Sequence, residues 1–207
     1  MTRILATVIL WSLASTVWAG APKVAVDIPP VHALVSRVMQ GAGAPDLIVS
    51  PGASAHGYSL RPSQAAALSD AHLVVWVGAD LTPWLSKPLD SLAGDAAVVD
   101  LLQVPGTVLR PFRTGAIFDR DHDDRQVTGG AGQGTVDPHA WLDPENASLW
   151  MAEIARALAE LDPDNAVLYA ANARAGQDEI ARLSTTISAM IDPARDQPFL
   201  VFHDAYH

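Results

Sequence analysis

The segment H-L-V-V-W-V, residues 72–77, is a short apolar run rich in β-branched and aromatic side chains. Such a run is typical of a strand that is buried on both faces of a parallel sheet. Similar runs alternate with helical patterns along the first hundred residues. The expected strands span 23–28, 46–50, 72–77 and 96–101, and the expected helices span 31–40, 62–68 and 84–92. This alternation predicts an α/β fold whose N-terminal lobe, residues 20–142, contains a parallel sheet.

Two longer helical patterns follow this lobe. Asp143 and Asp162 each precede a proline, which is the arrangement of an N-cap residue and a first helical residue. We therefore expect a helix from Asp143 to about 161 and a long linking helix over 163–190, both within a helical connection that spans 143–192. Asp192-Pro193 ends the second helix. Residues 198–202 are expected to form a strand, so that residues 193–207 begin a second α/β lobe.

A different composition separates the two halves of the chain. Residues 105–136 contain the glycine-rich stretch V-T-G-G-A-G-Q-G and the acidic run D-R-D-H-D-D around His122. The glycines do not match a phosphate-binding fingerprint, because no strand leads directly into them and no helix follows at the required point. A mobile loop is therefore expected here.

The first nineteen residues have the pattern of a secretory signal peptide that is cleaved after Ala19. Arg3 is followed by an apolar run over 4–13 and by V-W-A at 17–19, whose first and last residues are small enough for cleavage. A membrane anchor is the alternative, but a spanning helix needs about 20 apolar residues. The expected mature protein is exported, soluble and without a stable membrane anchor.

Composition narrows the class of protein further. Without Arg3, 12 Lys and Arg stand against 23 Asp and Glu, which gives a mature net charge of −11. An acidic surface argues against a nucleic-acid partner and is compatible with attracting cations. The chain has no cysteine, so it has no disulfides and any transition-metal site must use imidazole, carboxylate or water.

Three histidines stand at expected junctions between elements. These are His56 after the second strand, His139 before the helix that follows Asp143, and His203 at the end of the last strand. Their separations of 83 and 64 residues exclude a local zinc-finger module and fit ligands carried by loops at strand ends. Each of them could instead be an ordinary polar loop residue, but together they predict one metal site. An imidazole site suits zinc, whereas manganese or iron is favoured where carboxylates replace imidazoles.

The surrounding residues complete this interpretation. A zinc-bound imidazole usually donates its other ring N–H to a nearby acceptor, and Asp143 and Asp204 are candidates for that role. His32 and His72 are expected to be structural because they lie within a helix and a strand. His122 is an accessory metal candidate in its acidic loop.

The motifs G-A-S-A-H-G-Y-S-L-R-P-S (52–63), D-P-H-A-W-L-D-P (137–144) and F-L-V-F-H-D-A-Y (199–206) resemble those of zinc-binding periplasmic solute-binding proteins of ABC transporters. The resemblance covers essentially all of the mature chain. It implies two α/β lobes joined by a long rigid helix, with the metal in the cleft between them. His56 and His139 would be ligands from the first lobe and His203 the first ligand from the second. Manganese-type relatives tend to have a carboxylate in place of His203.

The resemblance also implies a monomeric periplasmic receptor that binds Zn²⁺ and delivers it to an inner-membrane ABC permease. Two departures stand out: Ala55 replaces a carboxylate that some zinc members carry, and the chain includes only the first strand of the second lobe. A C-terminally truncated lobe is therefore expected, without the family's acidic fourth ligand.

Two other functions remain open at this point. A zinc-dependent hydrolase would also use three histidines and an open water position. However, the sequence has no H-E-x-x-H motif and no nucleophile elbow, so we expect no enzyme. A periplasmic metal buffer or a non-functional truncated remnant is the third alternative.

Overall fold

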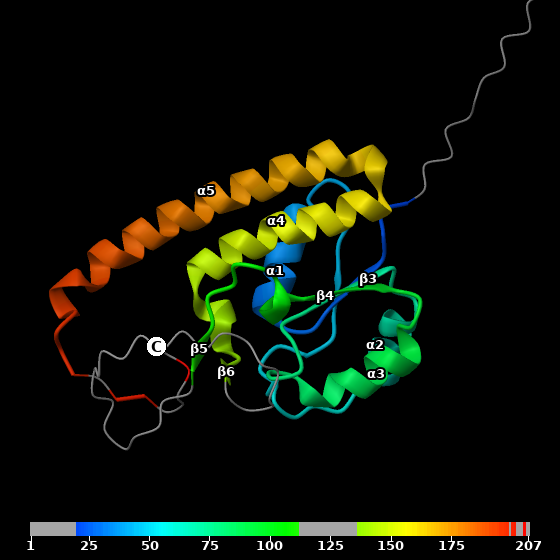
Figure 1. The fold of residues 1–207 in the computed structure, drawn as a ribbon, viewed down its shortest axis with the longest axis horizontal. Helices are drawn as coiled ribbons and strands as arrows, with labels where there is room; N and C mark the ends of the chain where they lie inside the picture. Colours follow the sequence, from blue (N-terminus) through cyan, green and yellow to red (C-terminus); the bar gives the residue numbers. More distant parts are fainter. Residues whose placement is uncertain (1–19, 112–135, 199, 202–204, 206–207) are drawn as a thin grey trace, which may run out of the picture.

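A parallel four-stranded sheet forms the centre of the molecule, which is described by a computed structural model covering residues 20–111, 136–198, 200, 201 and 205 (Figure 1). Its strands are β1 (Val24–Val26), β2 (Asp46–Leu47), β3 (Leu73–Trp76) and β4 (Ala97–Asp100). The order across the sheet is β2-β1-β3-β4. In the β1–β3 register, Val24 lies opposite Leu73 and Val26 opposite Val75. The expected strands are thus confirmed, each within three residues of its predicted bounds.

Helices cover both faces of this sheet. Alternate strand residues point to opposite faces. Val26 and Val75 belong to a core shared with α1 (Pro29–Val38) and α4 (Pro144–Leu161), whereas Ala25 and Val74 belong to a core shared with α2 (Pro62–Ser69) and α3 (Ser86–Leu92). Burial on both faces explains why β3 is apolar at every position, including Trp76.

Prolines and an aspartate set the beginnings of several helices. α1 begins two residues earlier than expected because Pro29 and Pro30 occupy its first turn, where no backbone N–H donor is needed. Pro83 opens a 3-10 turn, η1 (Pro83–Leu85), that leads into α3. The predicted cap of α4 is confirmed, since the Asp143 carboxylate accepts the Glu145 N–H at 2.8 Å.

The long linking helix starts one turn later than predicted. Pro163 opens a 3-10 turn, η4 (Pro163–Asn165), and α5 then runs from Ala166 to Ile191. At the start of η4, Asp162 makes no side-chain cap hydrogen bond of the kind predicted. It accepts hydrogen bonds from the Asn165 amide at 2.8 Å and from the Tyr169 hydroxyl at 2.7 Å, which fixes the corner between α4 and α5.

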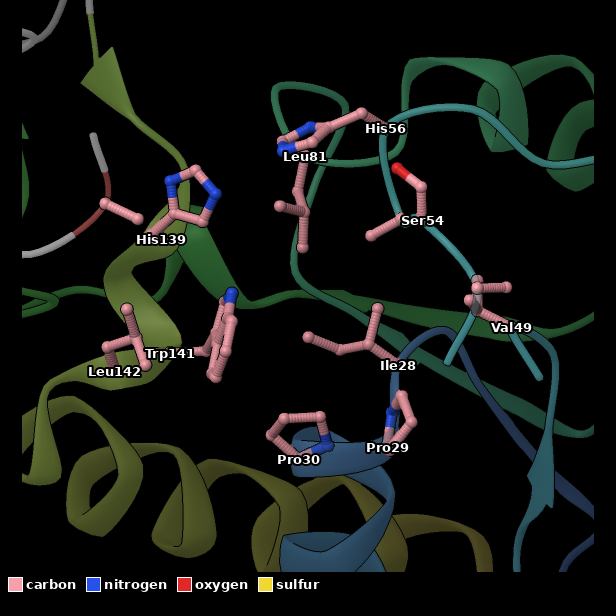
Figure 2. A pocket seen from close by; sticks show the side chains of 13 residues that line it. Ile28, Pro29, Pro30, Val49, Ser54, His56, Leu81, His139, Trp141 and Leu142 are labelled. Carbon is pink, nitrogen blue, oxygen red and sulfur yellow. The ribbon is translucent and has the colours of Figure 1, made fainter. Parts of the chain in front are cut away.

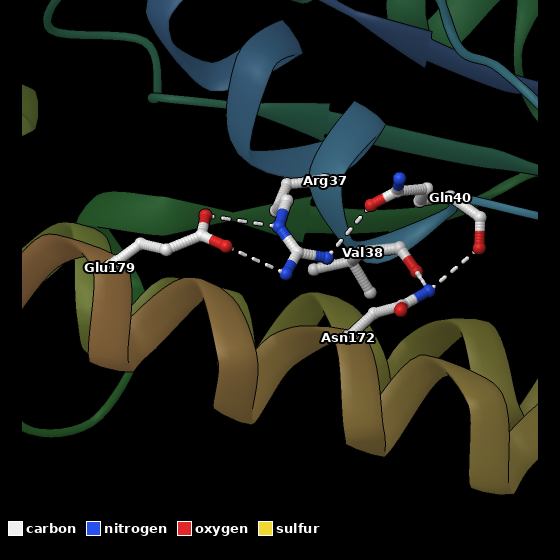
Figure 3. A network of polar contacts seen from close by, with 5 residues as sticks. All are labelled: Arg37, Val38, Gln40, Asn172 and Glu179. Carbon is white, nitrogen blue, oxygen red and sulfur yellow. Dashed lines mark hydrogen bonds and ion pairs between the residues drawn. The ribbon is translucent and has the colours of Figure 1, made fainter.

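Helix α5 is fastened to the end of α1 by polar contacts (Figure 3). The Arg37 guanidinium donates to both carboxylate oxygens of Glu179, at 3.1 and 3.0 Å. The Asn172 amide donates to the carbonyls of Val38 and Gln40, at 2.9 and 2.8 Å. Because the last carbonyls of a helix have no partner within the helix, Asn172 acts as a C-terminal cap for α1.

One apolar stripe runs along α5 at alternating spacings of four and three residues. Its first part, Tyr169, Ala173 and Gly176, is buried against α4 and α1. Its last part, Leu183, Ile187 and Met190, is 58%, 45% and 73% exposed. Figure 1 shows that this C-terminal half of α5 extends beyond the start of α4, so only half of the stripe is covered by the lobe.

Two expectations about the connecting segments are corrected. Within the loop expected over 105–136, residues 110, 111 and 136 belong to short strands instead, because β5 (Arg110–Pro111) pairs antiparallel with β6 (Val136–Asp137). Two-residue strands are too short to show an alternating pattern in the sequence. The strand expected over 198–202 is absent at Pro198, Leu200 and Val201, which are its described residues. A strand needs a neighbour for its hydrogen bonds, and neither described sheet includes this segment.

The remaining expectations fall largely outside the described residues. These include the signal peptide over 1–19, His122 with most of its loop, and His203 with Asp204. In the parts of the chain that the structure describes, no helix has both the length and the apolar character needed to cross a bilayer.

Candidate metal centre

A cavity of about 490 Å³ opens at the carboxyl edge of the sheet. Ile28 follows β1, Val49 follows β2 and Leu81 follows β3, and all three line this cavity. From β1 the chain passes to β2 on one side and later to β3 on the other, so the strand order reverses here. Such a reversal leaves a crevice outside the strand ends, where open α/β sheets bind their ligands.

His56 and His139 face each other across one end of the cavity (Figure 2). Their ring centroids are 5.3 Å apart and the ring planes meet at 74°. Two imidazoles bound to one tetrahedral zinc, with Zn–N bonds of about 2.0–2.1 Å, would place their ring centroids about 5.2 Å apart. The observed separation is close to this value, and it also lies in the ordinary range for an edge-to-face pair of rings.

The turn that carries His139 is held from two sides. His139 begins the 3-10 turn η3 (His139–Leu142), which leads directly into α4. Its ring Nδ1 lies 2.5 Å from Asp137 Oδ1, and both side chains are nearly fully buried. From the α4 side, the buried Asn146 amide donates to the carbonyls of Ala140 and Val108, and its oxygen accepts the Val108 N–H. The position of His139 is thus fixed by both β6 and α4.

The loop that carries His56 is more exposed but is also anchored. The Trp84 indole donates to the carbonyl of Ala55 at 2.7 Å, directly before His56. The Tyr58 hydroxyl lies 2.8 Å from the Ser50 hydroxyl and accepts from the Gln64 amide at 2.8 Å. These hydrogen bonds, with Ser50 contributing most, lower the pKa of Tyr58. They tie the loop to the end of β2 and the start of α2.

The rest of the cavity wall is mainly apolar. Besides the two histidines, the described residues that line it include no charged side chain; they are Ile28, Pro29, Pro30, Val49, Ala53, Ser54, Ala55, Leu81, Trp141, Leu142 and Ala205. An apolar wall of this kind strengthens electrostatic interactions with a bound cation, because apolar side chains screen charges less than water does.

A buried carboxylate lies directly beneath this wall. Asp27 directly follows β1 and is completely buried, and it accepts the N–H groups of Ile28 and Val77, each at 2.8 Å. Burial raises the pKa of Asp27 to about 7, despite these hydrogen bonds. Burial likewise raises the pKa of Asp100, at the end of β4, to about 6. Asp27 joins the ends of β1 and β3, and thereby shapes the floor of the cavity.

The structure brings together two of the three predicted ligands. His56 and His139 share the cavity, whereas His203 lies outside the described residues, although Ala205, two positions later, lines the cavity. Among the described residues, no group of three histidine or acidic side chains is placed to hold a metal ion. His32 bonds to the Pro45 carbonyl and His72 accepts the Lys23 N–H, so both have structural contacts, as expected.

The partner of His139 differs from the one expected. Asp143 was expected to be this partner, but its carboxylate caps α4, and the contact to the imidazole comes from Asp137. The signal for this contact was an aspartate two positions before a histidine with a proline between them, which favours a turn in which the carboxylate reaches forward. Asn146 was also missed, because a helical asparagine gives no sign of which backbone groups it will meet.

A family model described as the periplasmic zinc-uptake complex component A, ZnuA, matches residues 24–207. The chain belongs to the ZnuA family. It is 40% identical over 205 residues to the high-affinity zinc uptake system protein ZnuA of Paracoccus denitrificans, covering 91% of this chain and 63% of that protein. The chain thus spans less than two thirds of that ZnuA relative.

Solved structures of ZnuA agree with the observed fold. A ZnuA crystal structure superposes with a TM-score of 0.73 at 26% identity, covering 89% of this chain and 64% of that one. A ZnuA deletion mutant with zinc bound gives a TM-score of 0.72 at 27% identity, with the same coverages. The α/β lobe with its long helix is therefore the ZnuA fold over the matched part.

Proposed function

We propose that this chain is the zinc-binding part of a periplasmic receptor that captures Zn²⁺ and delivers it to an ABC permease for zinc uptake. The observation that carries the proposal is the pair His56 and His139, whose 5.3 Å separation fits one tetrahedral zinc ion. Family membership supports it, since the matching family is described as a zinc-uptake component.

The proposed ligands are His56, His139 and His203, with water at the fourth position. His203 follows α5 and belongs to the motif around Ala205, which lines the same cavity. Three neutral imidazoles favour zinc over manganese, which prefers carboxylate and water oxygens. His122 is proposed only as an accessory site that meets metal before the cavity does.

Zinc is the transported cargo in this proposal, and no covalent bond is made or broken. A zinc hydrolase would need a general base within hydrogen-bond reach of a metal-bound water. No carboxylate is among the described residues that line this cavity. Asp137 and Asp143 line a neighbouring cavity that shares His139, but Asp137 contacts the His139 ring and Asp143 caps α4. A protein that binds zinc but turns over no activated ester fits a receptor.

The test is a Zn²⁺ titration of residues 20–207 against a competing chelator, with circular dichroism to check folding. We expect one-to-one binding that weakens by more than about tenfold in His139→Ala and in His56→Ala, because each loses one zinc ligand. His72→Ala is the matched control, since this imidazole is exposed and lies at the other end of β3. Equal losses in all three variants would overturn the proposed site.

A second measurement separates a receptor from a metal buffer. Vesicles that contain the inner-membrane permease and its ATPase should take up zinc from the loaded receptor but not from the His139→Ala variant. Tight zinc binding without any transfer would indicate a buffer and contradict delivery to a permease.

A further inference from the structure

Asp137 is the one acidic side chain that the described structure places directly on a proposed zinc ligand. We infer that Asp137 is a positioning residue, which selects the His139 tautomer with the proton on Nδ1 and so leaves the Nε2 lone pair for the cavity. The expected effect of Asp137 on zinc affinity rests on the proposed function, whereas its effect on the His139 tautomer concerns the zinc-free protein.

One carboxylate oxygen of Asp137 contacts two nitrogen atoms of His139. Its Oδ1 accepts the backbone N–H of His139 at 3.0 Å and lies 2.5 Å from His139 Nδ1. The first contact closes a turn of the kind that aspartate forms with the residue two positions ahead. Pro138 lies within that turn at φ −78°, which is close to the value its ring imposes. Backbone and ring are therefore oriented by one oxygen atom.

The chemistry of the acceptor decides which ring nitrogen carries the proton. An ionised carboxylate only accepts hydrogen bonds, so the nitrogen beside it must be the donor. The neutral imidazole then has its proton on Nδ1 and its lone pair on Nε2. An imidazole without this acceptor would favour the opposite tautomer, and zinc would first require the proton to move.

The surroundings make this arrangement hard to replace. The side chains of Asp137 and His139 are only 4% and 8% exposed, so water has little access to either partner. Asp137 is also part of β6, where its backbone lies opposite Arg110 of β5 in the strand register. This strand pairing holds the backbone that carries the carboxylate. A carboxylate behind a ligand imidazole also makes its free nitrogen more basic, which strengthens the metal bond.

The test compares ¹⁵N NMR spectra of the histidine rings in zinc-free protein at pH 8, for the unmodified chain and for Asp137→Ala. We expect His139 to carry its proton on Nδ1 in the unmodified chain and on Nε2 in Asp137→Ala. Zinc affinity should fall about 10- to 100-fold in that variant, the usual effect of removing such a partner. Asp143→Ala, which removes the cap of α4 nearby, is the control and should leave the His139 tautomer unchanged.

A second variant keeps the inference testable if Asp137→Ala does not fold. Asp137→Asn keeps an oxygen acceptor, so we expect the Nδ1–H tautomer to persist while zinc affinity falls less than in Asp137→Ala. A proton on Nε2 in the zinc-free unmodified chain would overturn the inference, as would full zinc affinity in both variants at position 137. Because the ring spectra need no metal, failure of the chain to bind zinc would contradict the proposed function and leave the tautomer result standing.

Discussion

Asp27 is a buried acid whose ionisation works against folding. Its pKa is raised from 3.8 to about 7, chiefly by burial, so the folded state favours the protonated form. A raised acid pKa means that the unfolding free energy falls as pH rises from about 4 to 7 and levels off above that range. Asp100, with a pKa of about 6, acts in the same direction over a narrower range. We therefore expect chemical denaturation to show lower stability at pH 8 than at pH 5.

The variant Asp27→Asn tests the source of this slope. An asparagine can accept one of the two backbone N–H groups but not both, so at pH 5 it should cost about 1–2 kcal/mol. At pH 8 the difference from the unmodified chain should shrink or reverse, because the amide does not ionise. A constant difference across this pH range would mean that Asp27 does not titrate with folding.

Zinc binding should have the opposite dependence on pH. Only a neutral imidazole nitrogen binds zinc, and histidines ordinarily titrate near pH ~6.5. Affinity should therefore fall steeply as pH is lowered from 8 to 5, with protons released on binding. Chelator competition at several pH values measures this directly, and an affinity that stays flat would contradict histidine ligation.

The role of a residue could be predicted where its side chain has a distinctive chemistry. It could not be predicted where the role depends on which groups the fold places beside it. His56 and His139 were predicted as ligands because they stand at expected junctions between elements, and the structure places both at one cavity, while their role as ligands stays a prediction. Asp27 and Asp137 were missed, since a carboxylate gains its role from what the fold places beside it. Their partners, Val77 and His139, become visible only once the strand ends and the turn geometry are known.

Gly176 allows α5 to lie close to α4. A Cβ at this position would lie 2.3 Å from Met151 Cε and 3.2 Å from Arg37 Cγ, and Met151 is only 2% exposed. We expect Gly176→Leu to cost about 1–3 kcal/mol of unfolding free energy, because overpacking forces the two helices apart. Ala171→Leu, at an exposed position of the same helix, should change stability little. Equal denaturation midpoints for the two variants would argue against close helix packing at Gly176.

Asn172 and Glu179 fasten α5 to α1 with different strengths (Figure 3). Asn172→Ala leaves two helix-end carbonyls, of Val38 and Gln40, without this donor and should cost about 1–2 kcal/mol. Glu179→Gln weakens an ion pair with Arg37 whose Glu179 side chain is 53% exposed, and should cost less than about 1 kcal/mol. Urea denaturation of both variants measures the two losses of unfolding free energy. A larger loss in Glu179→Gln than in Asn172→Ala would contradict this prediction.

Most secondary-structure elements could be predicted, because their signals are local. The strands are continuous apolar runs, and prolines mark the beginnings of α1, α2 and α4. The short strands β5 and β6 could not be predicted, because two residues carry no periodicity and their pairing joins positions 110 and 137. The α/β class and the long helix were confirmed because their sequence patterns are long enough to show a period. Strands β5 and β6 were missed because two residues are too few to show one.

The molecule exposes an apolar surface at the far end of α5, formed by Leu183, Ile187 and Met190. Exposed apolar residues are ordinary when isolated, but a continuous stripe binds hydrophobic probes and partners. Replacing all three with glutamine should reduce binding of the dye ANS and change the unfolding free energy by less than about 0.5 kcal/mol, since they lie outside the core. Val167→Gln, an isolated exposed position that is 84% accessible, should not change dye binding. Unchanged dye binding in the triple variant would show that the dye does not bind at these three residues.

The contacts that fasten α5 to α1 also set the direction in which the rest of α5 extends from the lobe. Between Glu179, its last contact with α1, and Ile191, the helix extends about 18 Å at 1.5 Å per residue. A tilt of one degree at that contact displaces the far end of the helix by about 0.3 Å. Asn172 and Glu179 therefore set the direction of α5 as well as its attachment to the lobe. Substitutions at Asn172 and Glu179 would then shift the far end of α5 while leaving His56 and His139 in place.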